Sequence, residues 1–220
     1  MDTNSPESRT ESTRPDARRL ESLSGRVRGA ASGSQDDLSW VIEQLSPLMV
    51  TWAQMQLGSG SGLPFDPEDI VHDVWVRTLP ALGELHPHPD DGRMSSGLVA
   101  LLRTALLHRI VDLKRQEIAR RTRALSATSL DLADRPTSSS GPVQRAVRGD
   151  HHQHVLAALQ EIPARDRELY VRKIFEDMRL HELATEYGMT RDAVLKVRQR
   201  VRRRLEGLLT STVLEDLESD

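Results

Sequence analysis

The stretch ATEYGMTRDAV, residues 184–194, decides how the C-terminal part of this chain folds. Glycine costs roughly 1 kcal/mol in the interior of a helix relative to alanine, so Gly188 favours an interruption. Thr190, followed by a charged residue, is a typical cap at the start of a new helix. The stretch therefore predicts a helix that ends near the glycine and a second helix that begins after the threonine.

Apolar side chains on both sides of this turn fall at helical spacing. Before the turn they share one face of residues 179–187, and after it a series at i, i+3, i+7, i+11 and i+14 runs from Val194 to Leu208. Two amphipathic helices joined by three or four residues around a glycine form a helix-turn-helix. In this interpretation Ala184 lets the second helix cross closely, Gly188 supplies the backbone angle of the turn, and Val194 wedges between the helices.

The second of these helices is strongly basic, because residues 191–204 hold seven basic side chains and one acidic one. Charged runs are usually solvated helix faces. This excess of positive charge lies on the exposed second helix of a helix-turn-helix, however, and therefore favours DNA binding. Lys or Arg can pair with guanine or phosphate in a major groove, and Gln with adenine. At 100° per residue, the face opposite the apolar stripe carries Asp192, Lys196, Gln199 and Arg203, flanked by Leu195, Arg200 and Arg202.

The charges of the chain are segregated, although its net charge over 220 residues is only −3. Residues 64–91 carry seven acidic side chains and one basic, whereas residues 109–123 carry six basic and two acidic. Such blocks of like charge indicate surfaces that bind different partners. The absence of cysteine excludes disulfides and thiolate metal sites, and no apolar run approaches the roughly 20 residues of a membrane span. We expect a soluble, cytoplasmic protein without a signal peptide.

The pattern of helices and breaks predicts an all-helical (all-α) fold of two small domains joined by a flexible linker. Asp66 and Pro67 form a typical helix start, and a long helix, apolar first and basic later, is expected from Leu98 to about Arg121. The expected divisions are a disordered tail (1–37), a first helical domain (38–123), a linker (124–149), a second domain with the helix-turn-helix (150–209) and an acidic tail (210–220).

In this order, the acidic helix, basic helix, linker and C-terminal helix-turn-helix resemble bacterial RNA polymerase sigma factors of the extracytoplasmic-function (ECF) subfamily. The segment DPEDIVHDVWVR (66–77) resembles the polymerase-binding helix of sigma region 2. The segment LLRTALLHRIVDLKR (101–115) is similar to the helix that meets the promoter −10 element, and residues 156–209 resemble region 4. The resemblance covers roughly residues 38–209.

The resemblance implies a non-enzymatic sigma factor that needs no cofactor, binds core RNA polymerase at its clamp and flap, and directs initiation on promoter DNA. It leaves open whether an anti-sigma factor holds the protein inactive. The family often has Phe and Trp where this chain has Leu98 and Leu101, so the means of capturing the melted strand is not evident. The residues implied are Asp69 and Asp73 for polymerase binding, His108, Arg109, Asp112, Lys114 and Arg115 for the −10 element, and Arg191–Arg203 for the −35 major groove.

Two other functional classes share some of these features. A helix-turn-helix regulator that never binds polymerase would account for the C-terminal part, but it leaves the acidic and basic helices unexplained. An interaction protein is the second class, in which the acidic C-terminus (VLEDLESD) masks the basic helix and brakes DNA binding.

Two segments resemble ligand sites, but neither is expected to bind a ligand. The histidines at 151 and 154, or at 86 and 88, could bind a metal, but no carboxylate or third histidine completes a site, so no metal is expected. The segment LGSGSGLP (57–64) could cradle a phosphate, but no Gly-Lys-Ser/Thr follows, which favours a plain loop.

Overall fold

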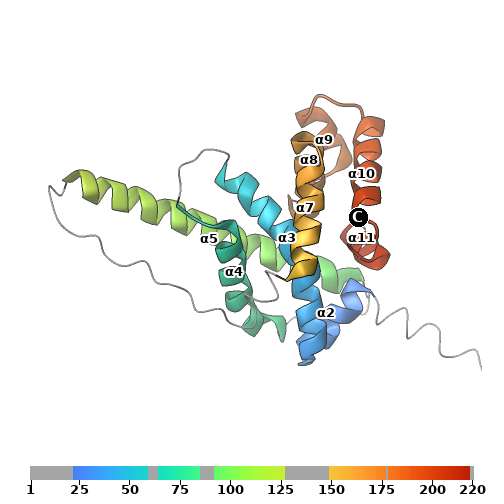
Figure 1. Ribbon diagram of the computed structural model, residues 1–220, viewed down its shortest axis with the longest axis horizontal. Coiled ribbons are helices and arrows are strands. Elements are labelled where there is room, and N and C mark those ends of the chain that lie inside the picture. The colour runs from blue at the N-terminus through green and yellow to red at the C-terminus, as the bar shows by residue number, and fades with distance from the viewer. Residues whose placement is uncertain (1–21, 59–63, 85–91, 127–148, 177, 219–220) are drawn as a thin grey trace, which may run out of the picture.

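The computed structural model describes residues 22–58, 64–84, 92–126, 149–176 and 178–218 (Figure 1). Within these ranges the chain is helical, and the one extended feature is an isolated bridge between Glu206 and Leu209. The predicted all-helical fold class is confirmed. None of the helices in the described part combines the length and hydropathy that crossing a bilayer requires.

The front of the chain forms α2 (Leu23–Ala31), α3 (Gln35–Leu57), α4 (Pro67–Leu82) and α5 (Gly92–Ser126), called here the front helices. The remainder forms α7 (Asp150–Glu161), α8 (Ala164–Glu176), α9 (Leu180–Glu186), α10 (Arg191–Leu205) and α11 (Ser211–Glu218), called the rear helices. Figure 1 shows α3 at the centre of the molecule, with α5 extending away from it.

Local sequence explains where several of these helices begin. Asp66 caps α4 by accepting a hydrogen bond from the Glu68 N–H (2.9 Å), and Pro67 occupies the first helical position. Both features agree with the start that the sequence predicted. Ser22 and Ser34 cap α2 and α3 in the same way, through the N–H groups of Gly25 and Asp37.

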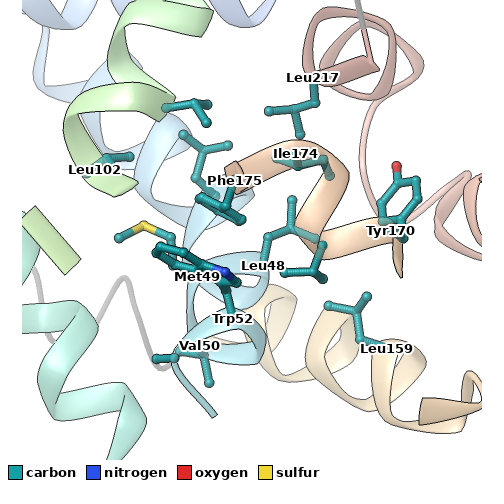
Figure 2. Close-up of a cluster of buried hydrophobic side chains, with 14 of the residues drawn as sticks. Leu48, Met49, Val50, Trp52, Leu102, Leu159, Tyr170, Ile174, Phe175 and Leu217 are labelled. Carbon is teal, nitrogen blue, oxygen red and sulfur yellow. The ribbon is translucent and has the colours of Figure 1, made fainter. Parts of the chain in front are cut away.

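The front and rear helices share one hydrophobic core (Figure 2). Its centre is Trp52 of α3, whose ring stacks on that of Phe175 in α8, with centroids 5.2 Å apart and planes 13° from parallel. The indole N–H of Trp52 also donates to the Glu176 carboxylate (3.3 Å). The division into domains 38–123 and 150–209 stays a prediction, but the described parts of the two segments pack directly against each other.

Both expected tails are partly wrong. The disordered tail was expected to end at residue 37, yet from Ser22 onward the chain is folded, with Leu23 and Val27 fully buried. The acidic tail from residue 210 contains α11, which buries Val213, Leu214 and Leu217. In both places, a few apolar residues at helical spacing acquire a buried environment only from helices distant in sequence.

The long helix α5 begins at Gly92, six positions before the expected start at Leu98. The first 21 residues, residues 85–91 and linker residues 127–148 lie outside the described residues.

Candidate nucleic-acid interface

The turn between α9 and α10 depends on one backbone angle. Gly188 has φ = +58°, a conformation that residues with a Cβ adopt at a cost. No atom lies within 4 Å of where a Cβ would stand, so the angle alone favours glycine there. The next residue, Met189, donates its N–H to the Ala184 carbonyl (2.8 Å), which closes the end of α9.

The helix α10 begins at the predicted threonine and turns its apolar stripe inward. Thr190 Oγ1 accepts a hydrogen bond from the Ala193 N–H (3.2 Å) and so caps the helix. Val194 is fully buried where α10 packs against α8 and α9, and Ala184 of α9 is buried as well. The other buried residues of the stripe are Val197, Val201 and Leu205.

The opposite face of α10 is open to solvent and holds cations without partners. Within the described parts of the chain, Arg191, Lys196 and Arg203 form no ion pair, and the Gln199 amide has no hydrogen-bond partner. These side chains are free to meet phosphates or base edges. Of the residues predicted for the −35 element, the exposed ones are Arg191, Asp192, Lys196, Gln199, Arg200 and Arg203, while Leu195 and Arg202 are half-buried.

Other arginines of α10 are already paired with carboxylates of the rear helices. Arg200 contacts Asp166 of α8 (2.5 Å), and Arg204 pairs with Glu161 of α7. Arg202 lies 3.6 Å from Glu206 and 3.4 Å from Glu215 of α11. The sequence did not separate Arg200 and Arg202 from the free cations, because Asp166 and Glu215 lie on other helices.

A network around Arg172 fixes α9 on α8. The guanidinium donates to Glu176 (2.8 Å) and Glu186 (2.5 Å), and to the Tyr187 hydroxyl (3.3 Å). These hydrogen bonds, the one to Glu186 first, raise the pKa of Arg172, whereas burial raises the pKa of Tyr187 to about 12. The phenol therefore stays neutral, and the start of the turn is held rigidly.

The structure joins residues from two of the predicted sites. Asp73 of α4, predicted to bind polymerase, contacts Arg109 of α5, predicted to bind the −10 element (2.5 Å). Only 20% of the Arg109 side chain is exposed, so this arginine also positions α5 against α4. Asp69 lies one turn earlier on α4 and is exposed.

The remaining residues predicted for the −10 element do not all face outward. His108, Asp112 and Arg115 are exposed on α5. Lys114 instead turns towards α3 and donates to the main-chain carbonyl of Gln56 (2.7 Å). Leu98 is fully buried, so it offers no surface on which an unpaired base could stack.

Sequence reasoning missed two exposed apolar side chains on this basic helix. Val111 and Ile118, seven residues apart on α5, are 42% and 65% exposed. The only available signal was their apolar character within a run of polar residues. Nearby, Glu117 contacts Arg120 and Arg121 (both 2.7 Å), and hydrogen bonds from these two arginines lower the pKa of Glu117 to about 2. An ionised carboxylate therefore offsets part of the positive charge at the end of α5.

Two of the three histidines of α7 take part in packing, while His154 is exposed. His151 accepts a hydrogen bond from the Gln44 side-chain amide of α3 (2.9 Å). His152 is fully buried, and neither of its ring nitrogens has a hydrogen-bond partner within the described residues. Burial, reinforced by neighbouring His151, lowers the pKa of His152 to about 4. No three His, Asp or Glu side chains of the described chain gather as a metal site would require.

Sequence comparison finds relatives along most of the chain. The ECF RNA polymerase sigma factor SigD of Mycobacterium tuberculosis is 27% identical over 186 residues, which cover 84% of this chain and 83% of SigD. SigD of Mycobacterium bovis gives the same figures. The ECF RNA polymerase sigma factor ShbA of Streptomyces griseus is 27% identical over 186 residues, covering 83% of this chain and 90% of ShbA. No family model matches the sequence, and no solved structure matches it.

Proposed function

Since this chain is a member of the ECF sigma factor family and so acts in transcription initiation, we propose that it binds core RNA polymerase and selects promoters through their −10 and −35 elements. The observation that carries the proposal is the length of the similarity, which covers 84% of this chain and therefore includes α4 and α5 of the front helices. A plain helix-turn-helix regulator would need to share only the C-terminal part of the chain.

The rear helices support a role at the −35 element. The free cations Arg191, Lys196 and Arg203 supply affinity through phosphates, and Gln199 can read an adenine edge. The residues buried under α10 hold it rigidly, so its outer face enters the groove without a rearrangement of the helix. Arg200 and Arg202, paired with carboxylates, position the helix and contribute less to DNA affinity.

The front helices support binding to polymerase and to the −10 element. Asp69 and Asp73 lie on the acidic side of α4 and, in this proposal, contact the basic clamp. The exposed residues of α5, His108, Asp112 and Arg115, are the ones available to the −10 DNA. The pair between Asp73 and Arg109 then couples the two functions, because it fixes α5 relative to the polymerase-binding helix.

The proposed mechanism is non-enzymatic and uses no cofactor or metal. The side chains described above bind and orient polymerase and DNA, while polymerase supplies the chemistry of RNA synthesis.

In vitro transcription tests the proposal most directly. Purified core polymerase and a library of genomic fragments are incubated with and without the protein, and the transcript starts are sequenced. We expect starts at a defined set of fragments that share two elements, only when the protein is present. A variant with Asp69→Ala, which leaves the pair of Asp73 and Arg109 in place, should lose these starts while keeping its affinity for DNA. DNA binding without any new transcript start would instead identify a regulator.

A further inference from the structure

Two exposed apolar side chains on α5 have no role in the polar contacts proposed so far. Val111 is 42% exposed and Ile118 is 65% exposed, and Val76 of α4 is the one other large apolar side chain exposed within the described residues. Single exposed apolar side chains are common on protein surfaces and need no explanation. These two lie seven residues apart on one helix, however, which places them on the same face of α5. Figure 1 shows the C-terminal half of α5 projecting beyond the other helices.

The face that these two side chains share also carries residues predicted for the −10 element. His108 and Arg115 lie three residues before and four residues after Val111, and both are exposed. Arg115 stands between the two apolar side chains and forms no ion pair within the described parts of the chain. A free cation flanked by apolar groups suits a partner that offers both phosphates and apolar surface, which favours DNA over another basic helix.

Two threonines make the same face more apolar than its sequence indicates. The hydroxyl of Thr104 donates to the Ala100 carbonyl (2.9 Å), and that of Thr122 donates to the Ile118 carbonyl (2.9 Å). Both hydroxyls are therefore engaged within α5, and the γ-methyl groups remain for an outside partner. Val111 has no donor or acceptor in its side chain at all. This face therefore cannot select bases chiefly by hydrogen bonds.

The chemistry of base edges identifies what such a face can recognise. In the major groove, the 5-methyl group of thymine is the apolar feature, and small apolar side chains or a threonine methyl contact it. Given the proposed function, on which this step rests, we propose that Val111 and Ile118 select promoters by contacting the 5-methyl groups of two thymines in the −10 region. Both side chains are β-branched and stiff, so they lose little rotamer freedom on binding.

The spacing on α5 sets the spacing of the two thymines. Val111 and Ile118 are separated by about 10 Å along the helix, at a rise of 1.5 Å per residue. In recognition helices, side chains three or four positions apart contact successive bases. The two thymines should therefore lie about two base steps apart, with Arg115 contacting a phosphate between them.

Replacing thymine by uracil tests this contact, because it removes the 5-methyl group and keeps the base pair. A promoter identified by transcription is synthesised with one thymine of its −10 region replaced at a time, on either strand. Its affinity for the holoenzyme of core polymerase and the full chain is measured by competition in fluorescence anisotropy. We expect uracil at two positions to weaken binding about fourfold each, which is the effect of exposing one buried methyl group.

Alanine variants assign each methyl group to a side chain. Val111→Ala should remove the effect of uracil at one of the two positions, and Ile118→Ala should remove it at the other. Ile118→Val keeps a β-branched apolar side chain and should retain most of the effect. The matched control is Val76→Ala, because this side chain is similarly exposed but lies on α4, so both effects of uracil should persist.

Two results would overturn the proposal while leaving the proposed function intact. In the first, the wild-type chain directs promoter-specific starts, but uracil has no effect at any thymine of the −10 region. In the second, both alanine variants keep every effect of uracil. If the alanine variants instead weaken assembly with core polymerase and uracil has no effect, this face binds protein and the proposal is wrong. Failure of the proposed function differs from all of these, because the wild-type chain then directs no promoter-specific start.

Discussion

Replacing Lys196 and Arg203 together with alanine should remove two phosphate contacts of α10 without disturbing its packing. Both side chains lie on the exposed face, and neither has an ion-pair partner among the described residues. The apolar stripe that holds the helix, from Val194 to Leu205, is untouched by the change. Any loss of binding therefore reports a contact with DNA.

The expected magnitude follows from counterion release. Each phosphate neutralised on duplex DNA contributes about 0.9 to the slope of log K against log salt concentration, so the double variant should flatten the slope by about 1.8. Between 50 and 200 mM salt, wild-type affinity should then fall about twelvefold more than the affinity of the variant. Gln199→Ala, by contrast, should change the preferred sequence and leave the slope unchanged.

Fluorescence anisotropy with a duplex that carries the −35 element identified by transcription measures both quantities. The matched control is Arg204→Ala, because this arginine is on the same helix but is paired with Glu161. We expect the slope of the control to stay close to wild type. Equal slopes in wild type and the double variant would refute the assignment of this face to the groove.

Three further changes test other parts of the structure. Gly188→Ala should lower the free energy of unfolding by about 1 kcal/mol, and Gly188→Asn by less, because the positive φ suits asparagine better; thermal denaturation measures both. The pKa of His152 is about 4 in the native state and 6.5 in the unfolded state, so the native state binds fewer protons between these two pH values. The free energy of unfolding should therefore fall as the pH drops from 6.5 towards 4, by up to about 3 kcal/mol. Urea titrations at pH 7.5 and pH 5 should show this decrease in wild type and much less of it in His152→Leu. An identical decrease in both proteins would mean that His152 is not its cause. Glu117→Gln should remove the carboxylate that contacts Arg120 and Arg121 and steepen the salt dependence of DNA binding; an unchanged slope would mean that the end of α5 does not contact DNA.

The helices that the sequence predicted well are those with strong local signals. Asp66 and Pro67 at the start of α4 and the threonine cap of α10 act through atoms a few residues away, so the sequence around them is sufficient. The helices α2 and α11 were missed because their local signals are weak. Leu23 and Leu214 become informative only once helices far away in the sequence bury them.

The candidate site also has features that local sequence predicts and features that depend on other helices. The outward face of α10 follows from helical geometry and was therefore accessible from the sequence. The partners of Arg200 and Arg109 lie on other helices, so no spacing rule distinguishes these two cations from free ones. Arg202 also contacts Glu206, four residues later, and only its second partner, Glu215, lies on another helix. The inward direction of Lys114 has the same cause, because its acceptor belongs to α3.

The stacked pair of Trp52 and Phe175 has a consequence for the lifetime of the protein in the cell. A change that separates the two rings would expose large apolar surfaces that are fully buried in the structure. Chaperones and proteases recognise such surfaces, so a variant that loses the stacked pair should be degraded faster than the wild-type chain.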